Sequence, residues 1–212
     1  MNIIILIAHF SSISVIVPLI LAIIQWRRLP VSISSIRWLL ISASIIDLLS
    51  FIFSKYSIPN HSLGNVYLLI QFSILLYMFS LQFDRTVFFK AAYVAFIIFY
   101  FVNLIFFQSF FTFNTNSNVA ACLILITVSI MFFYKLLSEL KVSNIHRLPI
   151  LWIAFATLFY YSGNLFLFLA SRYLEQSRES YAILWTIHNI LNLTKNVLFG
   201  IALWQNYKAV RS

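Results

Sequence analysis

Seven apolar segments, separated by short polar connections, follow one another along the chain. Each is close to the ~20 residues that an α-helix needs to cross roughly 30 Å of hydrocarbon. They cover residues 3–24, 34–54, 65–83, 87–107, 118–138, 150–171 and 181–206. Uninterrupted runs of this length favour spanning helices over the short alternating strands of a membrane barrel. The pattern predicts an all-α integral membrane protein with seven transmembrane helices.

The connections carry the helix breakers and polar clusters, including Pro30, Pro59 and Pro149. Each connection is about ten residues or fewer. None of them is a linker that would divide the seven segments into separate domains. A soluble catalytic or output module does not fit into connections of this length. We therefore expect residues 1–212 to form a single seven-helix transmembrane domain, with any chemistry or signal inside the bundle.

Composition supports this interpretation, because 62% of the residues are hydrophobic and only 9% are charged. The mean hydropathy is +0.96, and such a chain cannot hide its apolar surface inside a water-soluble globule. The first residues lack a basic region and a small-residue cleavage site, so we expect them to begin the first helix and not a removable signal.

The formal net charge of +9 is distributed unevenly over the two sides predicted from alternating connections. Three basic residues, Lys55, Arg172 and Arg178, fall on one side. Ten fall on the other: Arg27, Arg28, Arg37, Arg85, Lys90, Lys135, Lys141, Arg147, Lys208 and Arg211. Basic residues accumulate on the cytoplasmic side, so we predict the N-terminus outside and the C-terminus inside. The charge then reflects topology and anionic lipid headgroups of the bilayer, not nucleic acid.

Polar residues inside the apolar segments point to a shared interior. Asp47 is the only acidic residue well inside a segment, and an ionisable group there must face the bundle interior or a wet cavity. At 100° per residue, Ser44, Ser50 and Ser54 fall near Asp47 on one helix face. His188, Asn192, Lys195 and Asn196 form a similar face in the last segment, Tyr67 and Gln71 are one turn apart in the third, and His9 and Ser12 are i, i+3 in the first.

We predict that these faces line one polar cavity that binds a small or lipidic ligand. The candidate ligand contacts are Asp47, Gln71, Tyr160, Tyr161, Asn164, His188, Asn192 and Lys195. Asp47 and Lys195 differ by roughly 7 Å in depth, which a long side chain and a water bridge, so we expect them to form an electrostatic latch. Equally open is a buried ion pair that only fixes helix packing, with the Ser, Asn and His residues as interhelical hydrogen-bond partners.

One alternative is zinc-dependent hydrolysis inside the membrane, similar to the seven-helix adiponectin-receptor and alkaline ceramidase group. Two imidazoles and a carboxylate hold Zn²⁺ with a position left for water, and His9, Asp47 and His188 are the candidate ligands. The group carries two histidines one turn apart on helix 7. Here Asn192 stands four residues after His188.

A second alternative comes from Lys195-Asn196-Val197-Leu198-Phe199-Gly200, which resembles the Lys-x-x-Phe-Gly segment of microbial rhodopsins. The resemblance implies a retinal bound covalently to a lysine. When Phe199-Gly200 is matched to the family's Phe-Gly, Asn196 takes the place of the lysine and Asn192 that of its aspartate partner. The third segment offers Gln71 and no acidic counterion.

A third resemblance covers most of the chain. Tyr161-Ser162-Gly163-Asn164-Leu165-Phe166-Leu167-Phe168-Leu169, residues 113–118 and the polar face of the last segment resemble an uncharacterised family of small bacterial seven-helix proteins. Where that family carries glutamates, this chain has Gln71 and Ala121. The resemblance implies the fold and a bacterial inner membrane, but no activity.

Together these observations favour a non-enzymatic, receptor-like or sensory subunit that binds a ligand and signals through a protein partner. A small-solute transporter remains an alternative, since polar residues at mid-membrane depth also mark permeation paths. The sequence identifies no cofactor.

Overall fold

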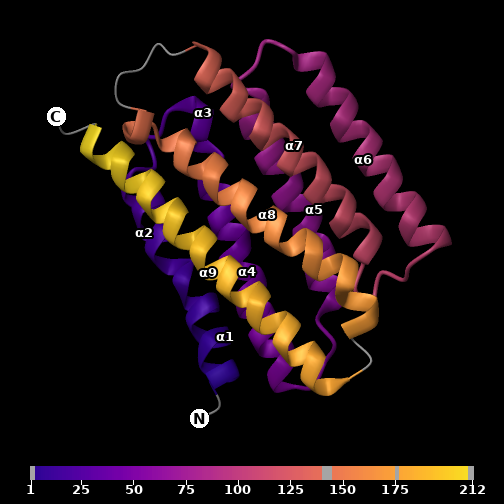
Figure 1. Cartoon of the computed structure of the whole chain (residues 1–212). Helices are drawn as coiled ribbons and strands as arrows, with labels where there is room; N and C mark the ends of the chain where they lie inside the picture. Colours follow the sequence, from indigo (N-terminus) through magenta and orange to yellow (C-terminus); the bar gives the residue numbers. More distant parts are fainter. Residues whose placement is uncertain (1–2, 140–144, 175–176, 210–212) are drawn as a thin grey trace.

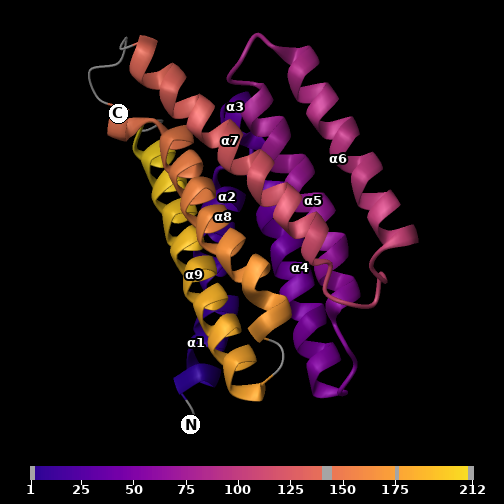
Figure 2. The ribbon, with the colours of Figure 1, turned by 45° about the vertical axis from the view of Figure 1, so that its right-hand side comes forward.

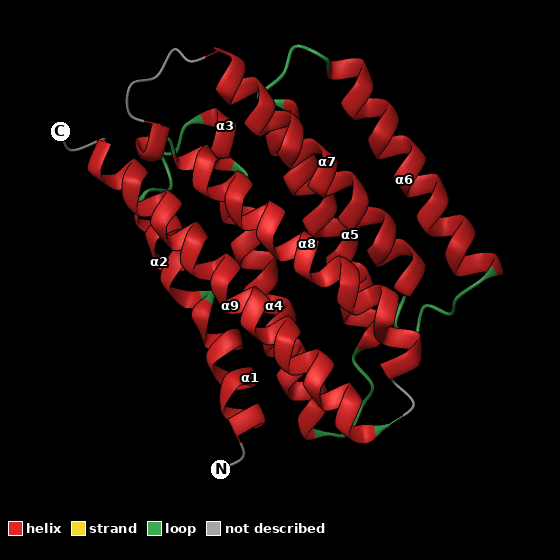
Figure 3. Ribbon diagram, viewed as in Figure 1, coloured by secondary structure: helices red, strands yellow, loops and turns green. Residues whose placement is uncertain are grey.

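The computed structural model describes residues 3–139, 145–174 and 177–209, and every regular element within them is helical (Figures 1 and 3). The elements are α1 (Ile3–Ser14), α2 (Ile16–Ile24), α3 (Val31–Ser34), α4 (Ile36–Lys55), α5 (His61–Ser80), α6 (Thr86–Phe106), α7 (Thr115–Glu139), η1 (Ile145–Arg147), α8 (Pro149–Leu174) and α9 (Arg178–Ala209).

The long helices lie side by side as a bundle, with the N-terminus at one end and the C-terminus at the other (Figure 1). Helix α9 packs mainly on α8, α1 and α2, whereas α4 packs mainly on α5 and α2. Helix α6 stands at the edge of the bundle, next to α7 and α5 (Figure 2). The first and last predicted helices are therefore neighbours. Helices α4 and α9 both pack on α2.

The first predicted segment is two helices, because Val15 separates α1 from α2. Pro18 explains the break: it has no backbone N–H to donate to the Ser14 carbonyl four residues earlier, and its ring crowds that carbonyl. The Ser14 hydroxyl donates to the Ser11 carbonyl at 2.6 Å, which gives the last turn of α1 a local partner. The predicted span over residues 3–24 is confirmed as one stretch long and apolar enough to cross a membrane, and it contains a break that the sequence analysis did not predict.

Six helical stretches of the described residues are long and apolar enough to cross a membrane, which fits an integral membrane protein. They are Ile3–Ile24, Val31–Lys55, His61–Ser80, Thr86–Phe106, Thr115–Glu139 and Pro149–Ser171. Helix α9, which contains the seventh predicted segment, is long enough at 32 residues but is not among them. Its amides, Lys195 and His188 reduce its apolar character. Lys141 and Arg211 lie outside the described residues, as do the side chains of Arg172 and Arg178.

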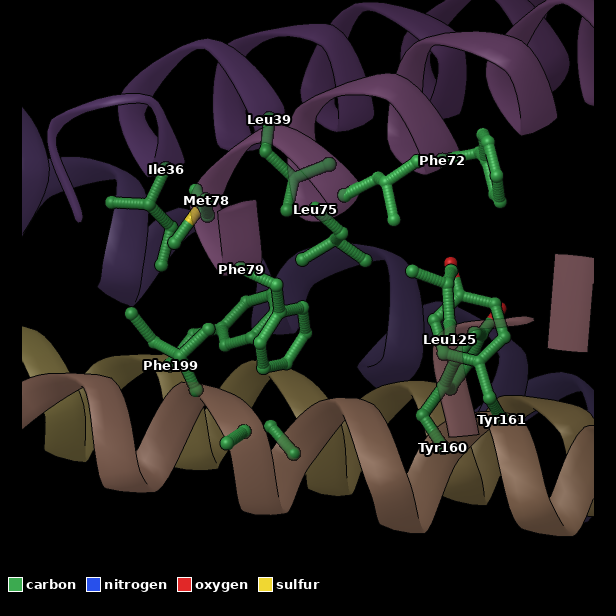
Figure 4. Packing of buried hydrophobic residues seen from close by; sticks show 14 of the residues in the cluster. Ile36, Leu39, Phe72, Leu75, Met78, Phe79, Leu125, Tyr160, Tyr161 and Phe199 are labelled. Atoms are coloured by element: carbon green, nitrogen blue, oxygen red, sulfur yellow. The ribbon is translucent and has the colours of Figure 1, made fainter. Parts of the chain in front are cut away.

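The apolar core lies between α4, α5, α7, α8 and α9, and Figure 4 shows Phe79 and Leu75 facing α8 and α9 across it. Close approach of α8 and α9 depends on Gly163, since a Cβ there would lie 2.6 Å from Leu191 Cδ1. Packing of this kind, with a small residue at the crossing, is typical of helices in membranes.

Candidate functional site

A cavity of about 600 Å³ lies at the end of the bundle where α1, α5, α7 and α9 begin and where α4 and α8 end. This size is within the range of small-molecule sites in proteins. Side chains from all six of these helices line it. Its polar and aromatic lining residues include Ser11, Ser12, Asp47, Ser50, His61, Tyr67, Gln71, Phe113, Tyr160, Tyr161, Phe168, Trp185, His188, Asn189 and Asn192.

The structure brings most of the predicted ligand contacts to this one cavity. Six of the eight line it: Asp47, Gln71, Tyr160, Tyr161, His188 and Asn192. Asn164 and Lys195 lie directly behind the lining, and each contacts a residue that does line it. Figure 4 shows Tyr160 and Tyr161 together beside Leu125 of the apolar core.

His188 is held in place by Asn164, with 2.6 Å between His188 Nδ1 and Asn164 Oδ1. The Asn164 amide nitrogen donates to the Tyr160 carbonyl at 2.8 Å, and a carbonyl only accepts. The oxygen of the amide therefore faces His188, so that Nδ1 of the imidazole carries the proton. In the neutral imidazole, Nε2 is then a free acceptor, because no hydrogen bond to it occurs in the described part of the chain.

Asp47 has no hydrogen bond and no ion pair within 4.0 Å among residues 3–139, 145–174 and 177–209. Its carboxyl group lines the cavity together with Ser50 of the same helix face. The two other serines of the predicted stripe do not join them: Ser44 donates to the Leu40 carbonyl of its own helix, and Ser54 is exposed. Asp47 thus depends on whatever fills the cavity for its polar partners.

Lys195 is 96% buried, with only 4% of its surface exposed, and its Nζ lies 4.4 Å from the centre of the Tyr160 ring. This is a cation–π contact, which partly compensates an ammonium removed from water. The direct ion pair with Asp47 is absent, although the two charges act on each other through space. The predicted latch stays a prediction, and it would operate across the cavity wall rather than by contact.

Gln71 is 4% exposed, and its side-chain nitrogen has no hydrogen-bond partner. A buried amide N–H without a partner costs roughly 1–3 kcal/mol. Gln71 lines the cavity from α5. A group that binds in the cavity could remove this cost.

A row of amides fastens α9 to the first two helices. Asn192 donates to Ser11 at 3.0 Å, Asn196 donates to Ser14 at 2.8 Å, and Asn206 donates to Gln25 at 2.8 Å. Asn192 therefore belongs both to the cavity lining and to this helix contact. Asn192 and Asn196 thus form the interhelical hydrogen bonds that one interpretation of the sequence expects, and Asn206 adds a third.

The candidate zinc ligands are not brought together. In the described part of the chain, no group of three His, Cys, Asp or Glu side chains is close enough to hold a metal ion. His9 is exposed and does not line the cavity. The cavity face of α1 consists of Ile4, Ala8, Ser11 and Ser12, and His9 lies about 60° beyond Ser12 on the helical wheel.

Sequence reasoning missed several lining residues. Trp185 is one turn before His188 on the same face of α9, so the i, i+3 spacing was a usable signal. His61 and Asn189 also line the cavity. His61 was assigned to a loop, and nothing in the sequence brings the start of α5 to the start of α9.

A second polar cluster lies in α6 and the segment before α7. Asn103 is at its centre and is 1% exposed. The Asn103 amide nitrogen donates to Asn114 at 2.6 Å, to Gln108 at 3.1 Å and to Ser117 at 3.3 Å. Its oxygen accepts from Asn116 at 2.8 Å. This cluster, here called the Asn103 cluster, ties the 107–114 connection to both helices.

Comparison of the chain with protein-family models, with curated proteins and with solved structures found no match.

Proposed function

We propose that this chain is a receptor-like membrane subunit that binds a small or lipidic ligand in the cavity and passes a change in helix packing to a protein partner. One observation carries the proposal: the cavity is lined by polar groups that the described chain leaves without partners, the Asp47 carboxyl and the Gln71 amide nitrogen. The Gln71 nitrogen is buried, and interiors normally satisfy such groups, whereas the Asp47 carboxyl is half-buried and reaches the cavity. Unsatisfied groups around a space of ligand size are typical of a binding site.

The proposal includes seven membrane-spanning helices, with α9 as the seventh. Burial against α8, α1 and α2 supports this, because the polar side of α9 then faces protein and not lipid. Its outward positions carry Ile183, Ile187, Ile190 and Val197, all exposed and apolar. We propose that α9 crosses the bilayer with its polar face toward the other helices and its apolar face toward lipid.

We also propose that the cavity opens toward the outside and that the C-terminal end lies in the cytoplasm. At that C-terminal end, Arg37 lies 4.7 Å from the Trp26 ring centre and Lys208 lies 5.6 Å from that of Trp204. Pairs of basic and aromatic residues are common at the membrane–water interface, and excess basic residues mark its cytoplasmic side. Ser109→Cys, at the cavity end, should react with an impermeant maleimide in intact cells, whereas Thr86→Cys should react only after lysis.

Ligand binding is tested with a variant that fills the cavity. Gly64 lines the cavity, and outside its own helix backbone no atom lies within 4 Å of a Cβ placed there. Gly64→Phe should therefore occupy the space without displacing a neighbour. Gly200 has equally open surroundings but lies away from the cavity, so Gly200→Phe is the matched control.

The measurement is native mass spectrometry and thermal shift of the purified full chain in detergent against a broad panel of metabolites and lipids. We expect at least one compound to bind the unchanged protein and Gly200→Phe, and to be lost from Gly64→Phe. If no compound distinguishes the two variants, the cavity is not a ligand site and the proposal fails.

A further inference from the structure

The cavity has an unexpected charge for this chain. The formal net charge of the whole sequence is +9, yet the lining side chains that the structure describes include one acidic residue, Asp47, and no lysine or arginine. Lys195 contacts the Tyr160 ring and does not line the cavity. Among the described side chains, an anionic ligand would therefore meet a carboxyl group with no lysine or arginine beside it in the lining.

Two acceptors in the lining point the same way, beside the Gln71 amide nitrogen, which is an unpaired donor. Asp47 offers carboxylate oxygens without partners, and His188 offers Nε2 because Asn164 occupies its Nδ1–H. Both are acceptors from different helices of one cavity. Two free acceptors, one of them an anion, suit a ligand group that donates several hydrogen bonds and carries positive charge.

The rest of the wall is aromatic. Tyr67, Tyr160, Tyr161, Phe113, Phe168 and Trp185 line the cavity. Rings of this kind attract organic cations through their faces and bury an apolar body. One face of the Tyr160 ring is already used by Lys195.

Building on the proposed function, we propose that the ligand is a protonated organic amine with an aromatic or apolar body, its ammonium group held between Asp47 and His188. Such a cation would supply Asp47 with the charge that Lys195 now supplies only through space. Binding would then weaken the attraction between α4 and α9, which both contribute residues to the lining. The ligand would then bind two arrangements of α4 and α9 with different affinity. A ligand must do so to shift the protein from one arrangement to the other.

Three probes of similar shape and different charge test this inference. They are phenethylamine, neutral 2-phenylethanol and anionic 3-phenylpropanoate. Binding to the purified full chain in nanodiscs is measured by isothermal titration calorimetry. We expect phenethylamine to bind at least about tenfold more tightly than either other probe, because a charge-assisted hydrogen bond is stronger than a neutral one.

Variants locate the effect. Asp47→Asn keeps the shape and should remove the preference for phenethylamine. Asp84→Asn, which changes an exposed acid at the other end of the bundle, should keep it. Gly64→Phe should block binding even if Asp47→Asn fails to fold.

Equal or tighter binding of 2-phenylethanol or 3-phenylpropanoate at the site blocked by Gly64→Phe would overturn the amine inference and leave the proposed function intact. Absence of binding by all three probes would also overturn it. The proposed function itself falls only if the broad panel shows no compound that Gly64→Phe excludes and Gly200→Phe retains.

Discussion

Two buried polar regions of this molecule have similar amino-acid types and different hydrogen bonding. In the Asn103 cluster, four side chains bond to Asn103 within 3.3 Å. Around the cavity, the Asp47 carboxyl and the Gln71 amide nitrogen bond to nothing in the described chain. Both regions hold amides on neighbouring helices. The first forms most of its contacts within the protein, with the Asn114 amide nitrogen as an unpaired exception, and the second leaves Asp47 and Gln71 to an occupant.

This difference separates a structural role from a binding role. A satisfied buried network stabilises the packing around it, whereas an unsatisfied one costs free energy until something fills it. His188 combines both roles, because its Nδ1 is hydrogen-bonded to Asn164 while the residue also lines the cavity. Substitutions should therefore have opposite effects on stability in the two regions.

The largest loss of stability is expected for Asn103→Leu. The change removes the common partner of Asn114, Asn116, Gln108 and Ser117. Leaving several buried polar groups unpaired should lower the free energy of unfolding by about 2–4 kcal/mol. Thermal unfolding in detergent measures this. Thr127→Val, at an exposed position whose hydroxyl bonds only to its own helix, is the control and should change little. An equal effect of the two variants would contradict the structural role of the cluster.

A matched pair of glutamines gives the sharpest contrast. Gln25 is buried and donates to the Leu203 carbonyl at 3.1 Å while accepting from Asn206 at 2.8 Å. Gln25→Leu should cost about 1–3 kcal/mol, because Asn206 and the carbonyl lose their partner. Gln71→Leu removes an amide nitrogen without a partner and should leave the ligand-free protein equally stable or more stable by up to about 1 kcal/mol. Chemical unfolding of both variants without ligand decides between them. A loss at Gln71 as large as at Gln25 would mean that Gln71 is satisfied.

An intermediate effect is expected for His188→Leu. Asn164, which is 0% exposed, would lose the donor to its side-chain oxygen, and the free energy of unfolding should fall by about 1–2 kcal/mol. The exposed His9 serves as the control, since His9→Leu leaves no buried group unpaired. Comparable melting temperatures for the two variants would remove the support for the tautomer assigned to His188.

Sequence patterns predicted much of this arrangement because helical periodicity is a local property. Asp47, Gln71, His188 and Asn192 were singled out as polar groups within apolar segments, and all four line the cavity. His9 was chosen on its chemistry, and its position on the helix wheel, about 60° past the lining face of α1, was not weighed. His61 and the α1–α2 break were missed for different reasons. The position of His61 depends on tertiary packing, whereas Pro18 carried a local signal for the break that we did not use.

The smallest effect is expected for the pair Asp47 and Lys195. Its coupling free energy tests whether the attraction between the two side chains stabilises helix packing in the ligand-free protein. The two charges are not in direct contact, so their attraction crosses the region of Tyr160. A double-mutant cycle with Asp47→Asn, Lys195→Gln and the double variant should give a coupling free energy of about 0.5–1 kcal/mol. Additive single effects would show that no latch exists, and the swapped pair Asp47→Lys with Lys195→Asp should then be no more stable than either single change. A measurable coupling that disappears on adding phenethylamine would connect the latch to the ligand, because the amine would have replaced Lys195 as the cation that Asp47 attracts.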